Sequence, residues 1–198
     1  MAKKLLTSVV CCLVVLFLMA SFVSAKNPKG PSGPAGKSNV GRLYLYEKSE
    51  ADWSIVEDGA WGKMKYRLSG TAFRFVFNGK KLIPGEEYTL IYYPDPWPGT
   101  GLICLGTGTA NEGGNVHIKE AAPIVTDLPT AEDLNNPENP SHDACDTDST
   151  CIDGAKIWLV LSSDVDCEDQ EMIGWNPAEY LFEDIGIFFD YTGDIIPE

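Results

Sequence analysis

The sequence predicts an all-β protein, an antiparallel β-sandwich of about eight strands with one short helix near residues 177–183. Three observations predict this fold class: apolar and polar residues alternate with a period of two, turn residues separate the alternating runs, and helical periodicity is weak. A β-barrel would show the same periodicity and stays open as the alternative. Aromatic residues on two faces favour the sandwich, in which two sheets pack face to face.

The expected strands share this alternation. Every second residue is apolar in 63–68 and in 73–77, so one face of each strand should be buried. Residues 88–93 are apolar on both faces, which is typical of the central strand of a packed sheet. The other expected strands are 42–46, 102–105, 116–118, 157–161 and 185–189. Asn78-Gly79 is expected to form a tight turn.

The one helical signal follows Asn176. Asn is a favoured N-cap residue, and Pro177 suits the first helical position because its ring fixes φ and it has no N–H to leave unpaired. These residues predict one or two helical turns.

The N-terminus has the features of an export signal. Lys3 and Lys4 precede an apolar run, 5–20, and small residues at 23–25 suit a signal peptidase, so residues 1–25 are predicted to be a signal peptide. A membrane anchor is the alternative, but the run is shorter than the roughly 20 residues that a span needs. We therefore expect a secreted or cell-surface protein with no transmembrane segment in the mature chain.

The mature chain is expected to hold one domain. Residues 26–39 contain no large apolar side chain and are predicted to be a disordered leader or a surface tether. Residues 40–194 are predicted to form the β-sandwich domain, which is long enough for a substantial core.

Charge is distributed unevenly along the chain. The whole sequence has 15 Lys and Arg against 29 Asp and Glu, a net charge of −14. Residues 26–119 have a net charge of +3 (12 basic, 9 acidic), whereas residues 120–198 have −19 (1 basic, 20 acidic). The acidic balance disfavours nucleic acid as a partner and favours a cation or a basic surface protein. The alternative is an acidic surface that only keeps the protein soluble.

Four cysteines follow the predicted cleavage site, and an even number in an exported chain predicts disulfides. Three pairings are possible. Cys145 and Cys151 enclose a short polar loop, so Cys145–Cys151 is favoured, which leaves Cys104–Cys167 by elimination. Zinc is the alternative, but its usual close Cys and His spacing is absent.

One acidic loop could hold calcium. Asp143, Asp146, Asp148 and Asp153 lie close together around the Cys145–Cys151 pair, and Ca²⁺ prefers several hard oxygen ligands. The spacing does not fit an EF-hand but is faintly similar to the Asp-rich, Cys-bearing calcium repeats of thrombospondin-type proteins. The run at 164–169 could add ligands if Cys167 brings it near. The alternative is a solvated polar loop.

Tyr92, Tyr93 and Trp97 form a candidate carbohydrate-binding face. Flat exposed rings can cover the apolar face of a pyranose, and the prolines around Trp97 would hold it at low entropic cost. The alternative is that Trp97 fills one end of the core, since Trp is usually well buried.

Hydrolysis has weaker candidates. A glycosidase needs two carboxylates around one bond. Glu179 and Glu183 would share a face if their segment were helical. A Ser-His-Asp site would need His117 or His142, and the chain has no Gly-x-Ser-x-Gly motif. We therefore do not expect an enzyme.

Three segments resemble a family of secreted prokaryotic single-domain proteins of no known activity. They are residues 154–160 (GAKIWLV), 174–183 (GWNPAEYLFE) and 90–99 (LIYYPDPWPG). The resemblance implies an exported single domain and assigns no site residue.

Together these features predict a secreted or cell-surface β-sandwich that binds without catalysis. The expected partner is a carbohydrate or another surface component, with calcium as a structural ion. A purely structural cell-envelope protein is the second hypothesis, and a secreted hydrolase is the third.

Overall fold

The computed structural model of the protein describes residues 38–130 and 154–193. The predicted signal peptide, most of the predicted leader and the acidic loop with its four aspartates lie outside the described residues.

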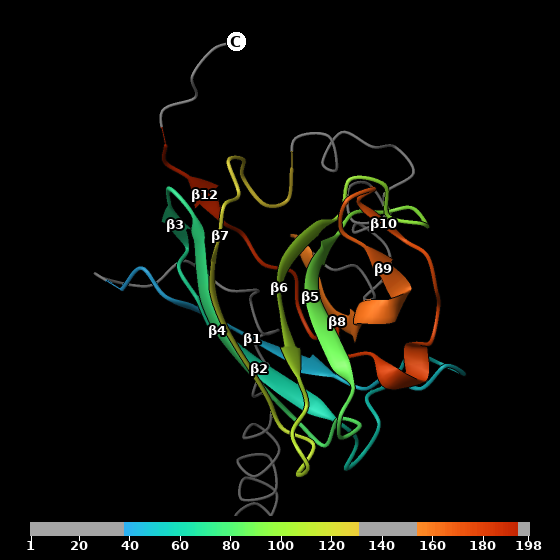
Figure 1. The fold of residues 1–198 in the computed structure, drawn as a ribbon. Coiled ribbons are helices and arrows are strands. Elements are labelled where there is room, and N and C mark those ends of the chain that lie inside the picture. The colour runs from blue at the N-terminus through green and yellow to red at the C-terminus, as the bar shows by residue number, and fades with distance from the viewer. Residues whose placement is uncertain (1–37, 131–153, 194–198) are drawn as a thin grey trace, which may run out of the picture.

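Two antiparallel sheets form the body of the fold and face one another (Figure 1). The larger sheet has the strand order β11-β1-β2-β4-β7 and the smaller sheet has the order β6-β5-β8. The larger sheet contains β1 (Gly41–Tyr46), β2 (Trp61–Tyr66), β4 (Phe73–Lys80), β7 (Val116–Ala122) and β11 (Phe182–Glu183). The smaller sheet contains β5 (Glu87–Tyr93), β6 (Ile103–Thr109) and β8 (Lys156–Leu161). Both sheets are open, so the predicted sandwich is confirmed.

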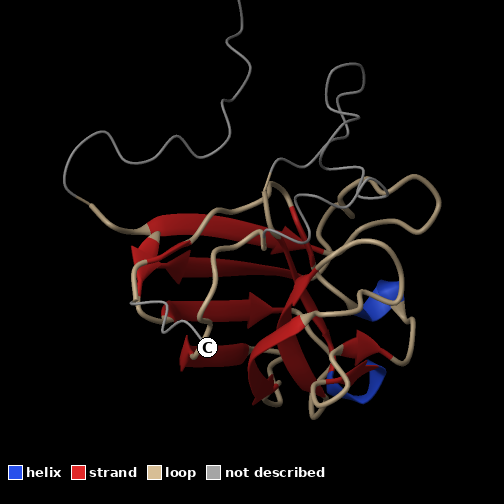
Figure 2. Ribbon diagram, turned by 90° about the horizontal axis from the view of Figure 1, so that it is seen from above, coloured by secondary structure: helices blue, strands red, loops and turns tan. Residues whose placement is uncertain are grey.

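Short elements complete the described part of the chain (Figure 2). The strands are β3 (Ser69–Gly70), which pairs in parallel with β12 (Asp190–Tyr191), and β9 (Val165–Asp166), which pairs with β10 (Glu171–Met172). Two single-turn 3₁₀ helices are η2 (Ser162–Asp164) and η3 (Pro177–Glu179). The predicted short helix is therefore present but ends at Glu179, because the chain is extended from Tyr180 into β11.

The apolar side chains form two layers. The first lies between the sheets and includes Leu43, Phe77 and Leu159. The second lies on the outer face of the smaller sheet, under residues 162–183, and includes Trp158 and Tyr180. β5 is buried on both faces because it borders both layers, which confirms the prediction of a central strand.

Two local predictions are wrong. Asn78-Gly79 does not turn, because β4 continues through both residues and pairs with β2 and β7 on either side. A Cβ at Gly79 would lie 2.7 Å from Val116 Cγ1, so the glycine permits close side-chain packing here. Residues 185–189 form isolated bridges at Ile187 and Phe189 instead of a continuous strand.

The predicted Cys104–Cys167 disulfide is present, with a Cα–Cα distance of 5.8 Å. It ties β6 to the segment that covers the smaller sheet. The predicted Cys145–Cys151 pair lies outside the described residues. Within the part of the chain that the structure describes, no helix is long and apolar enough to cross a membrane.

Candidate binding site: a tryptophan pocket

Four of the five tryptophans of the chain surround one pocket. Its volume is about 670 Å³, within the range of small-molecule sites. The residues that line this tryptophan pocket are Trp53, Tyr93, Asp95, Pro96, Trp97, Trp158 and Trp175. They come from three loops and two strands that are far apart in the sequence.

The floor of the pocket is a stack of two buried rings. Tyr93 on β5 and Trp158 on β8 lie with centroids 3.8 Å apart and planes 14° apart. The two strands are hydrogen-bonded neighbours, and both rings belong to the layer outside the smaller sheet. The regular sheet therefore gives the pocket a rigid base.

The walls are three rings that remain open to solvent. Trp53 is 51% exposed, Trp97 is 52% exposed and Trp175 is 42% exposed. Trp97 and Trp175 meet edge to face, with centroids 5.5 Å apart and planes 79° apart. Trp53 is tilted by 47° against Trp175 at 6.3 Å. Large apolar side chains exposed together mark an interaction site more often than single exposed ones do.

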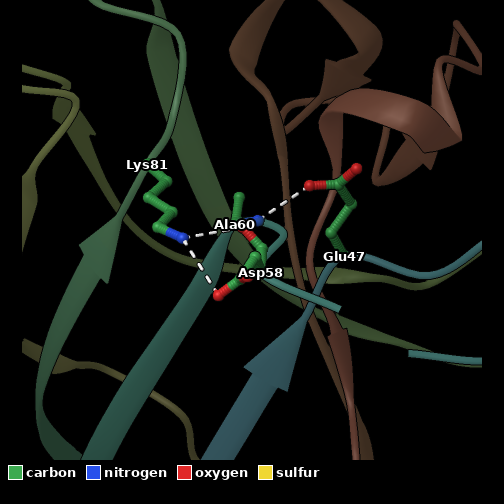
Figure 3. A network of polar contacts seen from close by, with 4 residues as sticks. All are labelled: Glu47, Asp58, Ala60 and Lys81. Atoms are coloured by element: carbon green, nitrogen blue, oxygen red, sulfur yellow. Dashed lines mark hydrogen bonds and ion pairs between the residues drawn. The ribbon is translucent and has the colours of Figure 1, made fainter. Parts of the chain in front are cut away.

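Trp53 is carried by the loop between β1 and β2, and polar contacts at the base of that loop hold it (Figure 3). Glu47 Oε2 accepts a hydrogen bond of 2.7 Å from the Ala60 N–H. The ammonium of Lys81 donates to the carbonyl oxygen of Asp58 at 2.7 Å and lies 3.9 Å from its carboxylate. The loop therefore leaves and re-enters the sheet in a fixed geometry.

The backbone of Trp53 itself is strained. Its φ is +58°, in the left-handed region, which costs an ordinary L-residue roughly 1–2 kcal/mol. The Trp53 N–H donates to the Ser49 carbonyl at 2.8 Å, and Asp52 accepts bonds from the N–H and hydroxyl of Ser54. The tight turn formed by these bonds presents a bulky ring at its tip. Strain of this kind is concentrated at functional sites.

Trp97 lies in the loop that follows β5. The Gly99 N–H donates to the Pro96 carbonyl at 2.7 Å, and the Met172 N–H donates to the Pro98 carbonyl at 2.9 Å. Gly99 has a φ of +76°, and a Cβ there would lie 2.4 Å from the ring of Tyr93. A glycine is therefore needed for the loop to approach the floor of the pocket.

Trp175 is positioned by a buried carboxylate. Asp164 Oδ2 accepts a bond of 2.7 Å from the side-chain amide of Asn176 and one of 2.5 Å from the Tyr180 hydroxyl. The carbonyl of Asp164 accepts the Gly174 N–H at 3.1 Å. Burial, and then the hydrogen bond to Asp164, raise the pKa of Tyr180 above its usual value of 10, so the hydroxyl stays protonated as a donor. Asn176 therefore binds Asp164 and makes no N-cap hydrogen bond.

The one carboxylate that lines the pocket is paired. Asp95 forms an ion pair with the ammonium of Lys156, and each side chain is 16% exposed. Lys156 does not line the pocket, so the wall receives from this pair an acceptor, the Asp95 carboxylate, whose charge is balanced by a neighbouring cation. Hydrogen bonds to charged groups are stronger than those between neutral groups.

A second carboxyl, Glu183, lies behind the pocket. It is 2% exposed, and its Oε2 has no hydrogen-bond partner among the described residues, nor has the Nε1 of Trp158. Burial raises the pKa of Glu183 to about 7, while a hydrogen bond from its own backbone N–H and the charges of Lys48 and Lys156 oppose the rise. Glu183 does not line the pocket. Asp184, the next residue, is exposed on the opposite face of the extended chain.

The structure separates the three aromatic residues that the sequence singled out. Tyr92 is fully buried between the sheets, and its hydroxyl oxygen accepts the Thr130 N–H at 3.2 Å. Tyr93 forms part of the pocket floor, and Trp97 forms one wall. Sequence reasoning missed the wall residues Trp53 and Trp175, since the only signal for them is that each lies among turn residues.

The predicted calcium ligands Asp143, Asp146, Asp148 and Asp153 lie outside the described residues, as does His142. In the acidic run at 164–169, Asp166 Oδ1 accepts the N–H groups of Glu168 and Asp169. Within residues 38–130 and 154–193, no three His, Cys, Asp or Glu side chains gather as a metal site would require.

The residues considered for hydrolysis are not brought together. His117 lies on the outer face of the larger sheet, where its Nδ1 is 2.8 Å from Asn78 Oδ1. Glu179 ends a single 3₁₀ turn and Glu183 is in β11, so the two do not share a helical face.

Comparisons with protein-family models, with curated proteins and with solved structures found no match. The resemblance to the secreted prokaryotic family therefore stays a prediction, and the function has to be argued from the pocket.

Proposed function

We propose that this protein is a non-catalytic binding module and that its tryptophan pocket holds a sugar residue of a carbohydrate ligand. The observation that carries the proposal is the set of three half-exposed indole rings around one stacked aromatic floor. Indole rings offer a large apolar surface with only two side-chain torsions to fix, so they bind at low entropic cost. The apolar face of a pyranose suits such a surface.

The polar part of the pocket also suits a neutral ligand. Asp95 is paired with Lys156, so the pocket offers a ligand a hydrogen-bond acceptor whose charge is already balanced. Sugar hydroxyl groups can both donate and accept. The wall rings are steeply inclined to one another, which suits one sugar inserted between them better than a flat polymer surface lying across them.

An organic ammonium cation is the second candidate ligand. The observation in its favour is the same inclination of the rings, because several aromatic faces directed at one point form a cage for a methylated ammonium group. The pairing of Asp95 argues against it, since a cage of this kind gains from an uncompensated carboxylate.

Binding can be followed by the fluorescence of the pocket tryptophans, after a glycan array has selected a sugar. Trp97→Ala should weaken binding of that sugar by at least about tenfold, or roughly 1.4 kcal/mol, because it removes one wall. Trp61→Ala is the matched control, since Trp61 is 37% exposed but lies outside the pocket. Its affinity should stay within about twofold.

The ligand series distinguishes the candidates. Saturable binding of choline or trimethyl-lysine, with no sugar bound, would replace the carbohydrate with the organic cation. If neither class binds, or if both substitutions weaken binding equally, the pocket is not the binding site and the hypothesis of a structural envelope protein is favoured.

Secretion and calcium binding complete the proposal. The N-terminal signal supports a secreted or cell-surface location, and N-terminal sequencing of native material tests it by locating the first residue. The four aspartates between 143 and 153 support a structural Ca²⁺ ion. Calorimetry of the full chain with Ca²⁺ tests this, and the absence of heat down to millimolar affinity would reject it.

A further inference from the structure

The outer face of the larger sheet has a single sign of charge. Side chains alternate along each strand, so one set of residues from β1, β2, β4 and β7 points away from the core. Seven of the fifteen Lys and Arg residues of the chain belong to this set or directly extend it. These residues, named here the basic face, are Arg42, Lys63, Lys65, Arg67, Arg74, Lys80 and Lys119. The outward positions of these four strands carry no carboxylate.

Strand register places the cations beside one another. Arg42 on β1 is directly opposite Lys65 on β2, and the same row continues through Val76 to Lys119 on β7. Arg67 lies next to Arg74, since the Arg67 N–H donates to the Arg74 carbonyl at 2.9 Å. Neighbouring strands are about 4.8 Å apart, so like charges meet at close range, which destabilises a sheet.

Ion pairs within the part of the chain that the structure describes do not compensate this repulsion. Among residues 38–130 and 154–193, the basic face forms no salt bridge. Lys80 donates to Asn115 Oδ1 at 2.8 Å, and Lys63 lies 4.9 Å above the ring of Tyr44. Two carboxylates are close to this face: Asp184 near Tyr46 of β1, and Glu120 of β7, which lines the groove described below. The chain has almost twice as many acidic as basic residues, yet the cations of this face form no ion pair within the described residues.

The basic face also contains a groove. Its volume is about 590 Å³, and Lys65, Arg67, Arg74 and Lys119 are among its lining residues. Val76 and the carboxylate Glu120 also border it. The groove thus combines four cations with the apolar side chain of Val76 and one carboxylate.

We propose that the basic face binds an anionic polysaccharide that carries carboxylate or sulfate groups. Charge complementarity carries the proposal, because a polymer with regularly spaced anions can neutralise the rows of like charge. Nucleic acid fits less well. Single strands bind where aromatic rings alternate with cations. Here the half-buried Tyr44 and Tyr46 and the exposed Trp61 lie together at one end of the sheet. The net charge of −14 also repels the denser polyanion more strongly.

The test measures binding of the full chain to polygalacturonate, dextran sulfate, uncharged dextran and single-stranded oligothymidylate at low and physiological salt. We expect both anionic polysaccharides to bind, with affinity falling as salt rises, and uncharged dextran not to bind. The triple variant K65Q/R74Q/K119Q should lose at least about tenfold in affinity, since it removes three cations of the groove.

The matched control I83E/T107E/T109E changes the net charge by the same three units at exposed positions outside the basic face. Its affinity should stay within about threefold. Thermal unfolding checks both folds, and the triple variant should unfold at the same temperature as the wild type or higher, because like-charge repulsion is reduced. Trp97→Ala should leave polysaccharide binding unchanged, so failure of the pocket proposal and failure of this one are distinguishable.

Four results would overturn the proposal. The first is that neither anionic polysaccharide binds at low salt, and the second is that the triple variant and its control lose affinity equally. The third is that oligothymidylate binds more tightly than the polysaccharides. The fourth is self-association at low salt that the triple variant abolishes. The last result would identify a second copy of this chain as the occupant.

Discussion

Glu183 carries the most deeply buried carboxyl group among the described residues. A carboxyl that is removed from solvent without a full set of hydrogen bonds prefers its neutral form, because burial penalises the charge. Because its pKa is about 7, the carboxyl is partly ionised at neutral pH, and this buried charge lowers the free energy of unfolding. The positive charges of Lys48 and Lys156 stabilise the ionised form, but they offset only part of the penalty of burial.

The pKa of Glu183 predicts how stability depends on pH. In the unfolded chain the carboxyl titrates near 4.5, and in the folded chain near 7. Between these values the folded protein keeps a proton that the unfolded chain releases, so the free energy of unfolding falls as pH rises through this window. The contribution is fully present below the unfolded pKa and lost above the folded pKa. It amounts to about 3 kcal/mol.

Glu183→Gln should remove this loss, because the amide does not ionise. Urea unfolding between pH 4.5 and 8 should show the variant gaining stability over the wild type as pH rises. Burial also raises the pKa of Asp184, so the free energy of unfolding of the variant should still fall with rising pH, by a smaller amount. Glu87→Gln, at an exposed position, is the control and should follow the wild type. A pH-independent difference between Glu183→Gln and wild type would contradict this assignment.

At the scale of elements, sequence reasoning succeeded where the signal is local. The alternation in residues 63–68 and the two-faced apolar run at 88–93 predicted β2 and β5. Successive side chains of a strand point to opposite faces, so the spacing of apolar residues shows which faces are buried. It failed at Asn78-Gly79, where pairing with strands on both sides overrides a turn-forming dipeptide.

The tryptophan pocket could not be predicted in the same way. Trp97 was a candidate because prolines flank it, but Trp53, Trp158 and Trp175 join it only through the tertiary fold. No spacing in the sequence relates these positions. The basic face was also not predicted. A net charge of +3 over residues 26–119 does not show that the alternation of the strands places the cations on one side of a sheet.

The turn that carries Trp175 depends on the Asp164 carboxylate. A hydrogen bond to a charged group contributes about 1.5–3 kcal/mol, so Tyr180→Phe should lower the free energy of unfolding by that amount. It should also weaken sugar binding, because Trp175 loses its anchor. Tyr46→Phe, which removes a hydroxyl on the outer face of the larger sheet, should change neither property.

A double-mutant cycle of Tyr180→Phe with Asp164→Asn isolates the interaction, since residues that share a hydrogen bond give non-additive effects. Urea unfolding of the four proteins measures it. Additive effects would mean that the 2.5 Å contact between the Tyr180 hydroxyl and Asp164 does not hold the turn.

At the scale of the whole molecule, the protein has three layers. The larger sheet presents cations to solvent. Strands β5 and β8 of the smaller sheet are buried on both faces, and residues 162–183 cover this sheet and bring Trp175 to the pocket. The two proposed binding surfaces are therefore on different sides of the sandwich. A surface polymer on the basic face and a sugar in the pocket could be bound at the same time.

The third layer is joined to the second by the Cys104–Cys167 disulfide, which spans 63 positions in the sequence. A crosslink that closes a loop of this length restricts the unfolded chain by about 4 kcal/mol in the chain-entropy model. C104A/C167A should therefore lower the free energy of unfolding by about that amount. Residues 162–183 should then open more readily from the smaller sheet, so sugar binding and the fluorescence of the pocket tryptophans should both decrease.

Hydrogen exchange shows which segments lose stability when the disulfide is removed. Amides of β9, β10 and the turn at 173–180 should exchange faster in C104A/C167A, whereas those of β2 and β4 should change only with global stability. The matched control T107A/E168A alters exposed residues beside the two cysteines and keeps the crosslink. Equal stability of variant and control would show that the buried contacts of Tyr180 and Phe182 are enough to hold the third layer. Uniformly faster exchange would show instead that the three layers unfold as one unit.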